Sequence, residues 1–335
     1  MLYIHQFPDW TKFRFNPGKV LASLGETRME QGKLLGNLNV VGFGPWEYSL
    51  FAQDMENNFA IDGRKSDSSK ILDEASLKNK SSIPYIKNFW NLLETPKPLF
   101  SLDMLFTLHA SMGQIKMHKF RDCSGEICYG EFSFTGPSPD RICNEMEHFI
   151  HWLNESNTDG VVKAAIAHFW LLTIRPFKDA NGIMARTLSA MLLAKSENTS
   201  HYLYALNSEI YKDRENYFRI LSKSQKGNGD LTEWILWFLS TLKKAIEKSQ
   251  QQLFPLVKQS RFNCQHQGKN LTQRQQKFLS SLLTENAATS FTAKDYAIFS
   301  ATSHDTALRD IQELMKMNII GKEKKGGRSA CYRLL

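Results

Sequence analysis

The stretch "TIRPFKDANGIMARTL", residues 173–188, decides the fold and raises the question of function. Its small residues Ala180, Asn181 and Gly182 form a turn directly before the helical pattern "IMARTLSAMLLAK". Backbone N–H groups at the start of a helix, together with the positive end of the helix dipole, form an anion site. Arg186 follows Gly182 by four residues, where its guanidinium can hold a phosphate through two hydrogen bonds. The stretch therefore predicts either a phosphate-binding loop or a turn of small residues that only caps the helix.

The residues just before the turn add a metal ligand and an unusual cation. Pro176 and Phe177 can fix the loop against a core, and Asp179 offers a hard oxygen ligand of the kind that Mg²⁺ prefers. Arg175 stands where a proton-accepting side chain would be sought. Arginine cannot accept a proton at neutral pH, because its pKa lies above ~12.

Composition is that of a globular protein with two or three domains: 335 residues, 42% hydrophobic and 23% charged. The start, "MLYIHQFPDWTKF", has neither the basic nor the apolar region of a secretory signal. The most apolar run, "HFWLLTI" at residues 168–174, is too short to span a bilayer. The five cysteines include no C-x-x-C pair, which favours free thiols over disulfides or a zinc site. We therefore expect a cytoplasmic protein without a membrane partner.

Hydrophobic patterns divide the chain into three parts. Residues 1–85 contain an aromatic cluster, a helical pattern over 18–38 and a Ser- and Lys-rich stretch at 66–82 that predicts a linker. Residues 86–262 are mostly amphipathic helix. Within them "GVVKAAIAHFWLLTI" is apolar almost all round, which predicts a helix buried in a bundle. The Gly- and aromatic-rich interval 119–139 predicts a β-hairpin flap.

The third part, residues 263–335, predicts three helices and a closing hairpin around Gly326 and Gly327. This order is that of a winged helix of the helix-turn-helix class. Residues 270–335 hold ten Lys/Arg and six Asp/Glu, so DNA is a candidate partner. The candidate contacts are Ser303, His304, Thr306 and Arg309 on the third helix, with Lys322, Lys324, Lys325 and Arg328 on the wing. Asp305, Asp310 and Glu313 make the helix less basic, so dimerisation or protein docking is the alternative.

The loop resembles the signature of the Fic (Fido-domain) family, H-P-F-x-[DE]-G-N-G-R-x-x-R. The matching residues are Pro176, Phe177, Asp179, Asn181, Gly182 and Arg186. The segments "FPDWTKFRF…RMEQGKLLGNL", "AAIAHFWLLTI", "YALNSEIYKDRENYF" and "LTEWILWFLSTL" are also similar to those of Fic proteins. The resemblance implies a mainly α fold: a small N-terminal helical domain (1–85), a Fic/Fido helical bundle with a β-hairpin flap (86–262) and a C-terminal winged helix (263–335).

Family members typically move AMP from ATP-Mg²⁺ onto a Thr, Ser or Tyr hydroxyl of a protein. By resemblance, Asp179 would bind Mg²⁺, Arg186 would contact the terminal phosphate and Phe177 would anchor the loop. Asn181 and Gly182, with Ala180 in the place of a glycine, would form the anion nest. The resemblance also implies that a homodimer is to be expected. The protein target has no signal in the sequence.

Three positions depart from the signature. Arg175 replaces the histidine that acts as general base, whose assistance is typically worth about 10²–10⁴ in rate. Ala180 replaces the first glycine and tolerates positive φ poorly, which is expected to reshape the loop. Ile183 replaces the first arginine and removes one phosphate clamp.

The stretch "NFAIDG", residues 58–63, resembles the family's inhibitory pattern [ST]-x-x-x-E-[GN]. Asn58 stands for Ser/Thr, and Asp62 stands for the glutamate that pairs with the second motif arginine. The alternative is a helix end capped by Gly63. The flap segment "FSFTGP" predicts an edge strand for a target peptide, or a hairpin without a partner.

We therefore expect a Fic-family protein, similar to protein adenylyltransferases, whose AMP transfer is weak or lost. It would keep a phosphate or nucleotide pocket and act in regulation or interaction. Two alternatives stay open. One is an active transferase of AMP or a phosphoryl group that uses an unusual base. The other is a DNA-binding regulator in which the Fic core is only a scaffold. His168, in the helix before the loop, is expected to be a core histidine and not a rescuing base.

Overall fold

The computed structural model describes residues 2–95, 99–112, 119–129, 132–283, 290–323 and 330–335. Contacts divide the chain into two compact units. The first unit is Met1–Leu35 with Phe43–Ser249, and the second is Gly36–Gly42 with Gln250–Leu335. The predicted boundaries at 85/86 and 262/263 stay predictions. Within the described ranges, every helix is too short or too polar to cross a membrane.

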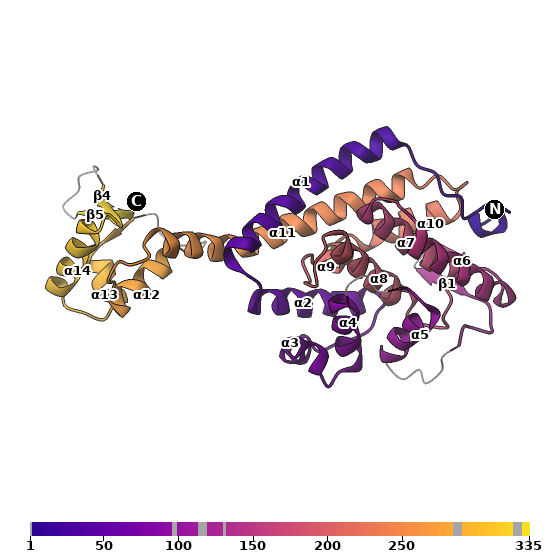
Figure 1. The fold of residues 1–335 in the computed structure, drawn as a ribbon, viewed down its shortest axis with the longest axis horizontal. Helices are drawn as coiled ribbons and strands as arrows, with labels where there is room; N and C mark the ends of the chain where they lie inside the picture. The colour runs from indigo at the N-terminus through magenta and orange to yellow at the C-terminus, as the bar shows by residue number, and fades with distance from the viewer. Residues whose placement is uncertain (1, 96–98, 113–118, 130–131, 284–289, 324–329) are drawn as a thin grey trace. The chain divides into compact units, whose positions relative to one another are not determined.

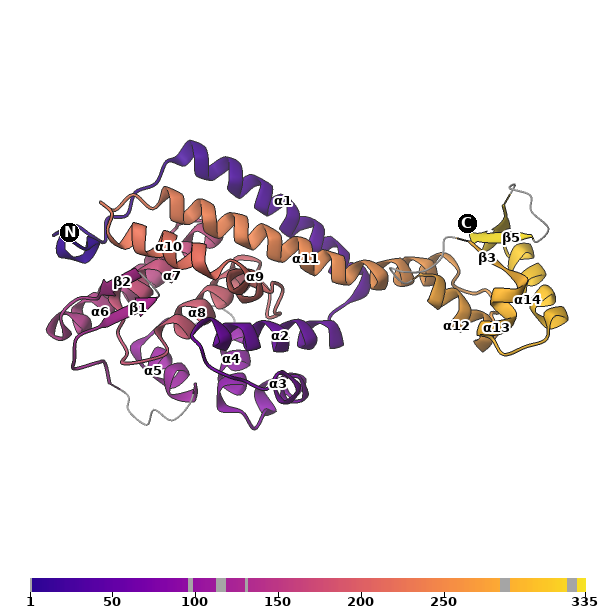
Figure 2. The same ribbon diagram turned by 180° about the vertical axis from the view of Figure 1, so that it is seen from behind.

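The first unit is mainly helical (Figures 1 and 2). Its elements are η1 (Ile4–Gln6), α1 (Pro17–Val41), α2 (Pro45–Ile61), α3 (Ser68–Ala75), η2 (Lys78–Lys80), α4 (Pro84–Glu94), α5 (Leu102–Ser111), β1 (Glu126–Tyr129), β2 (Phe132–Thr135), η3 (Pro139–Arg141), α6 (Ile142–Glu155), α7 (Gly160–Ile174), α8 (Asn181–Ser196), α9 (Leu206–Lys212), α10 (Arg214–Gln225) and α11 (Thr232–Gln265). Helices α1 and α11 extend into the second unit.

The centre of the first unit is the pair α7 and α8. Almost every side chain of α7 is buried, as its all-round apolar sequence predicts. Asp159 caps its first turn by accepting from the backbone N–H groups of Val161 and Val162. Trp234 of α11 is fully buried against the pair and donates from Nε1 to the carbonyl of Ala165 at 2.7 Å. The loop at residues 175–180 therefore connects two helices that are surrounded by the core.

The N-terminal segment is integrated into this unit. Helices α1 and α11 start side by side, where Thr232 Oγ1 accepts from the backbone N–H of Asn16 at 2.8 Å. They run in parallel, and Glu26 pairs with Lys243 further along at 2.8 Å (Figures 1 and 2). Trp10 and Phe13, from the predicted aromatic cluster, pack edge-on against Trp170 of α7.

Residues 66–82 are not a linker, so that prediction is wrong. Residues 68–75 form α3, which starts at Asp67, whose side chain caps the first turn. Ile71 and Ala75 are buried, and Glu74 accepts hydrogen bonds from Ser81 and Ser82 in the segment that follows. The polar composition led to the wrong prediction because α3 buries only a narrow stripe of small and aliphatic residues.

A buried carboxylate fixes α2 to the start of α9. Asp54 is fully buried and accepts from the hydroxyls of Tyr202 and Ser208 at 2.5 and 2.8 Å. It also accepts from the backbone N–H groups of Asn207 and Ser208 at the first turn of α9. Burial raises the pKa of Asp54 to about 6, although these hydrogen bonds act in the opposite direction. The buried carboxylate of Asp54 thus holds α2, whose C-terminal end reaches α8 through Asp62.

The predicted flap is a two-stranded antiparallel hairpin. Strands β1 and β2 pair in the register Glu126↔Thr135 to Tyr129↔Phe132. Phe134 is buried at its base, against Tyr3 and His5 of the N-terminal segment. The hairpin is therefore fixed at its base.

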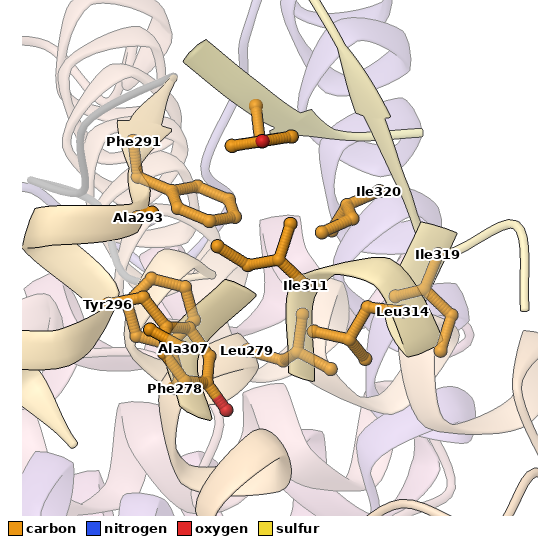
Figure 3. Close-up of a cluster of buried hydrophobic side chains, with 11 residues drawn as sticks. Phe278, Leu279, Phe291, Ala293, Tyr296, Ala307, Ile311, Leu314, Ile319 and Ile320 are labelled. Atoms are coloured by element: carbon orange, nitrogen blue, oxygen red, sulfur yellow. The ribbon is translucent and has the colours of Figure 1, made fainter. Parts of the chain in front are cut away.

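The second unit contains α12 (Gln273–Leu282), β3 (Phe291–Thr292), α13 (Ala293–Phe299), α14 (His304–Lys316), β4 (Ile320–Lys322) and β5 (Cys331–Leu334). Its antiparallel sheet has the order β3-β5-β4. Three helices followed by two paired antiparallel strands are present as the sequence predicts, and β3 is an addition. The predicted turn around Gly326 and Gly327 lies outside the described residues. Figure 3 shows the core, in which Phe278, Tyr296, Ile311 and Leu314 of the helices meet Phe291 and Ile320 of the sheet.

One prediction about the third helix of this unit is wrong. Asp310 is buried, so it does not reduce the positive charge of the exposed face. Its carboxylate accepts two hydrogen bonds from Arg274, at 2.7 and 3.0 Å, and one from Tyr296 at 2.9 Å. It therefore ties the three helices together. Ser303, His304 and Arg309 are exposed and Thr306 is partly buried, while Lys324, Lys325 and Arg328 lie outside the described residues.

The raised pKa of Asp54 predicts a specific pH dependence of stability. The folded protein binds the Asp54 proton more tightly than the unfolded chain, so this stability is present at low pH and is lost as pH rises through about 6. Asp54→Asn removes the ionisation. The free energy of unfolding of the parent minus that of the variant should fall by about 2 kcal/mol between about pH 4.5 and 7. Urea titrations at both pH values test this, and a difference that does not change with pH would contradict it.

Candidate functional site

Two residues with left-handed backbone conformation bound the loop between α7 and α8. Arg175 (φ 49°, ψ 62°) follows the end of α7, and its N–H donates to the carbonyl of Leu171 at 2.9 Å. Ala180 (φ 60°, ψ 16°) begins α8. This conformation costs a residue with a side chain roughly 1–2 kcal/mol. Ala180 therefore keeps the positive φ expected of a glycine, and the strain is stored in the loop.

Asn181 and Phe177 hold the loop from within. The Asn181 amide accepts from the Phe177 N–H at 3.0 Å and donates to the Phe177 carbonyl at 2.7 Å. The Phe177 ring is buried and stacks on His109 with ring centroids 3.8 Å apart. His109 Nε2 lies 3.0 Å from the backbone carbonyl of Asp179. Asn181 thus acts through the backbone of the loop, as a positioning residue.

Arg186 is the buried cation of the site, with 1% of its side chain exposed. It donates to the Asp62 carboxylate at 2.8 Å and to Asn58 at 2.6 Å (Oδ1) and 2.9 Å (O). The phenol of Tyr217 also interacts electrostatically with the charge of Arg186. Burial by itself lowers the pKa of Arg186, but the Asp62 carboxylate, together with Tyr217 and Tyr129, outweighs burial and the net shift is upward. A guanidinium paired in this way stays charged in the core.

The carboxylate of Asp62 lies at the start of α8, against Gly182. A Cβ atom added at Gly182 would come within 2.6 and 2.7 Å of the two Asp62 carboxylate oxygens. The absence of a side chain at Gly182 therefore makes the space that this anionic group fills. The start of α8 accepts an anion here, and the chain supplies that anion itself.

Asp179 lies on the outer side of the loop, with 64% of its side chain exposed. Its Oδ1 accepts from the N–H of Ala180 at 2.6 Å, and its Oδ2 pairs with the guanidinium of Arg64. Among the described residues, no group of three or more His, Cys, Asp or Glu side chains could hold a metal ion. The Asp179 carboxylate is thus engaged by Arg64 and by the N–H of Ala180.

Arg175 lies beneath the flap and is 9% exposed. It lies near Tyr129 of β1, where its charge acts to lower the pKa of the phenol, although burial raises that pKa more strongly. The Tyr129 ring stacks on Phe218 of α10 with ring centroids 3.9 Å apart. The Arg175 carbonyl accepts from Arg121 Nε at 2.7 Å. Burial, and to a smaller degree the charge of Arg175, lower the pKa of Arg121. Arg175 Nε has no hydrogen-bond partner among the residues that the structure describes.

An open cleft of about 920 Å³ lies beside this cluster. It is bounded by the end of α2, the flap and the first turns of α10, through Ile61, Asp62, Gly63, Cys128, Tyr129, Phe132, Asp213, Arg214, Glu215, Asn216, Phe218 and Arg219. Its volume suits a nucleotide-sized molecule. Because Asp62 lines it, the anion position and the cleft are continuous.

Two histidines near the loop are committed to other contacts. His168 is fully buried, and its Nε2 lies 3.0 Å from the hydroxyl of Tyr217, which agrees with the expected core role. Burial and the charge of Arg186 hold the pKa of His168 well below its usual value. His109 is buried against Phe177, and burial lowers its pKa as well.

The structure sorts the predicted site residues into three groups. Asn58, Asp62, Gly182 and Arg186 converge on one position. Phe177, Ala180 and Asn181 shape the loop, while Asp179 and Arg175 lie on its outer side and under the flap.

Sequence reasoning missed Arg64, Tyr129 and Tyr217, which contact Asp179, Arg175 and Arg186 respectively. Only Arg64 had a signal, namely its position directly after "NFAIDG".

Comparison with known proteins identifies the region that contains the loop. The family model described as "Fic/DOC family" matches residues 99–193, and a model described as a domain of unknown function (DUF4172) matches residues 3–80. "Protein adenylyltransferase fic-1" of Caenorhabditis elegans is 28% identical over 107 residues, which are 28% of this chain and 21% of that protein. "Protein adenylyltransferase Fic" of Drosophila grimshawi is 30% identical over 110 residues, 29% of this chain and 23% of that protein. The chain thus spans about a fifth of the length of these curated relatives.

A solved structure is similar over nearly the whole chain. A Fic family protein from Desulfovibrio desulfuricans G20 aligns with a TM-score of 0.60 at 18% identity, covering 96% of this chain and 97% of that one. Fold and site together define a helical protein built around an anion-binding loop at the start of a buried helix. That loop lies in the matched region, so the chain contains a Fic/DOC domain, preceded by an N-terminal domain of the DUF4172 type.

The left-handed backbone of Ala180 predicts that glycine is better at this position. Ala180→Gly should raise the free energy of unfolding by about 1 kcal/mol, because it relieves the strain of a positive φ. Ala190→Gly, in the interior of the same helix, should instead lower it by about 1 kcal/mol. Denaturant unfolding of both variants tests the assignment, and destabilisation by both substitutions would contradict it.

Proposed function

We propose that this chain binds a nucleotide polyphosphate at its Fic/DOC domain while its AMP transfer is weak or lost, and that it acts in regulation or interaction. The observation that carries this proposal is the pairing of a retained anion site, at Gly182 and Arg186, with an arginine at residue 175. The names of the curated relatives, which are adenylyltransferases, support the nucleotide class. Free cysteines support a cytoplasmic location.

The missing base is the reason to expect little transfer. A guanidinium has no acceptor site for a proton, so the side chain at residue 175 cannot remove a proton from an acceptor hydroxyl. His109 and His168 are buried and engaged elsewhere, which argues against rescue by either one. The charge of Arg175 can still assist binding, since its Nε is a buried donor without a partner in the described part of the chain.

The residues present fit ATP and Mg²⁺. The space beside Gly182, called the cradle below, already holds the carboxylate oxygens of Asp62. Phosphate oxygens are also negatively charged hydrogen-bond acceptors. Asp179 would hold the metal, because Mg²⁺ typically takes one or two carboxylates and completes its shell with phosphate oxygens and water. When bound, Mg²⁺ would neutralise charge on the phosphates. Asp62 would have to leave the cradle first, which makes the end of α2 an inhibitory segment.

An active transferase that uses an unusual base is the alternative. DNA binding by residues 270–335 has weaker support. The exposed residues of α14 include Asp305 and Glu313 beside His304 and Arg309, so the face is close to neutral. DNA-binding surfaces are strongly basic.

Calorimetric titration with ATP and Mg²⁺ tests the retained pocket. Arg186→Ala should weaken binding by roughly tenfold or more, because a charged double contact is removed. Arg309→Ala, an exposed change in the second unit, is the matched control and should bind like the parent. Circular dichroism checks that Arg186→Ala folds. Absence of ATP binding by both the parent and Asp62→Asn, in which a neutral amide replaces the carboxylate, would refute the pocket.

Restoring the base tests the loss of transfer. Arg175→His with Ala180→Gly, in an Asp62→Asn background, should raise self-labelling by radioactive ATP roughly 10²-fold or more. Arg175→Gln in the same background removes the charge without adding a base and should give no such gain. Appreciable labelling by the purified parent protein would support the alternative instead.

A further inference from the structure

The short segment at the end of α2 contacts two charged residues, one in the loop and one in the first turns of α8. Asp62 pairs with the cation Arg186, and Arg64, two residues on, pairs with the anion Asp179. One segment therefore neutralises the anion site and the metal ligand at the same time.

The backbone of this segment is fixed, so the two contacts are set together. Helix α2 ends at Ile61, and Gly63 follows with φ 72°. The N–H of Gly63 donates to the carbonyl of Ala60 at 3.0 Å, and the N–H of Arg64 donates to that of Phe59 at 3.0 Å. Such bonds close a helix end into a defined turn.

The first pair uses the position of an anion. The carboxylate of Asp62 lies where a side chain at Gly182 would be, at the positive end of α8, and bonds Arg186. These are the features that bind phosphate oxygens at a helix start.

The second pair uses the position of a cation. The guanidinium of Arg64 pairs with Oδ2 of Asp179, while Oδ1 is taken by the N–H of Ala180. A metal ion would therefore have to compete for either oxygen of Asp179, the one carboxylate of the loop.

We propose that residues 62–64 form a two-charge plug that imitates a metal-bound phosphate, with Asp62 in the place of the anion and Arg64 in the place of the cation. The proposal rests on the proposed function, since it concerns the same site. An anion alone displaces Asp62 but leaves Arg64 on Asp179. A metal ion alone displaces Arg64 from Asp179, but the displaced guanidinium then lies beside an ion that is also positively charged. A metal–polyphosphate complex supplies both charges, so the plug favours the complex over either component.

The two contacts differ in strength. Asp62 and Arg186 are 14% and 1% exposed, whereas Arg64 and Asp179 are 29% and 64% exposed. Exposed ion pairs are weak because water and salt screen them, and buried pairs are costly to break. Arg64 is thus the side that opens first, and its removal should change metal affinity by a factor of about 2–5.

The first experiment measures metal binding without nucleotide. Mn²⁺ alone, followed by electron paramagnetic resonance, should bind Arg64→Gln about 2–5 times more tightly than the parent. Lys65→Gln makes the same charge change at the next, exposed position and should bind like the parent. Asp179→Asn added to Arg64→Gln should abolish the gain. Equal Mn²⁺ affinity in the two single variants would overturn the plug, whatever nucleotide does.

The second experiment measures ATP binding by calorimetry, with Mg²⁺ and with EDTA. Arg64→Gln should strengthen binding of ATP in Mg²⁺ by about 2–5-fold and leave binding in EDTA unchanged or weaker. Lys65→Gln should change neither. If no variant binds ATP, the proposed function fails and the Mn²⁺ result decides the plug. If the variants bind ATP and the ATP affinity of Arg64→Gln in Mg²⁺ equals that of Lys65→Gln, the pocket is supported and the plug is refuted.

Discussion

The buried ion pair between Arg186 and Asp62 is the interaction on which the site depends. A guanidinium with 1% exposure is tolerated in a helical core only if its charge and its donors are satisfied. Asn58 and Asp62, at the end of α2, supply the acceptors, and the Asp62 carboxylate supplies the opposite charge. The start of α8 therefore carries a counterion that comes from the N-terminal segment. This pair is one of the contacts that join the N-terminal segment to the Fic/DOC domain.

The sequence predicted most helices because their hydrophobic periods are regular. Helix α7 follows from its all-round apolar pattern, and α8 follows from the helical pattern directly after the turn of small residues. Helix α3 was missed because its polar surface outweighs the two buried residues, Ile71 and Ala75. Asp310 was placed on the surface because periodicity cannot reveal a buried carboxylate whose partners, Arg274 and Tyr296, are distant in sequence.

The site was predicted as a set of residues but not as a set of contacts. Spacing in the loop identified Gly182 and Arg186, and the resemblance to the Fic inhibitory pattern identified Asp62. The pairing of Arg64 with Asp179 depends on how the turn after α2 is directed, and no local pattern encodes that. The contact of Tyr129 with Arg175 depends on the flap folding over the loop, which is a tertiary event. Charge complementarity between segments 115 or more positions apart is visible only in three dimensions.

Gly182 has a consequence that reaches beyond conformational freedom. The same missing side chain admits the carboxylate of Asp62 and, in the function proposed above, would admit a phosphate, because both need the space directly above its Cα atom. A methyl group there would displace Asp62 and would exclude that ligand as well. A substitution that distinguishes the two occupants therefore has to be made in residues 62–64 and not at Gly182.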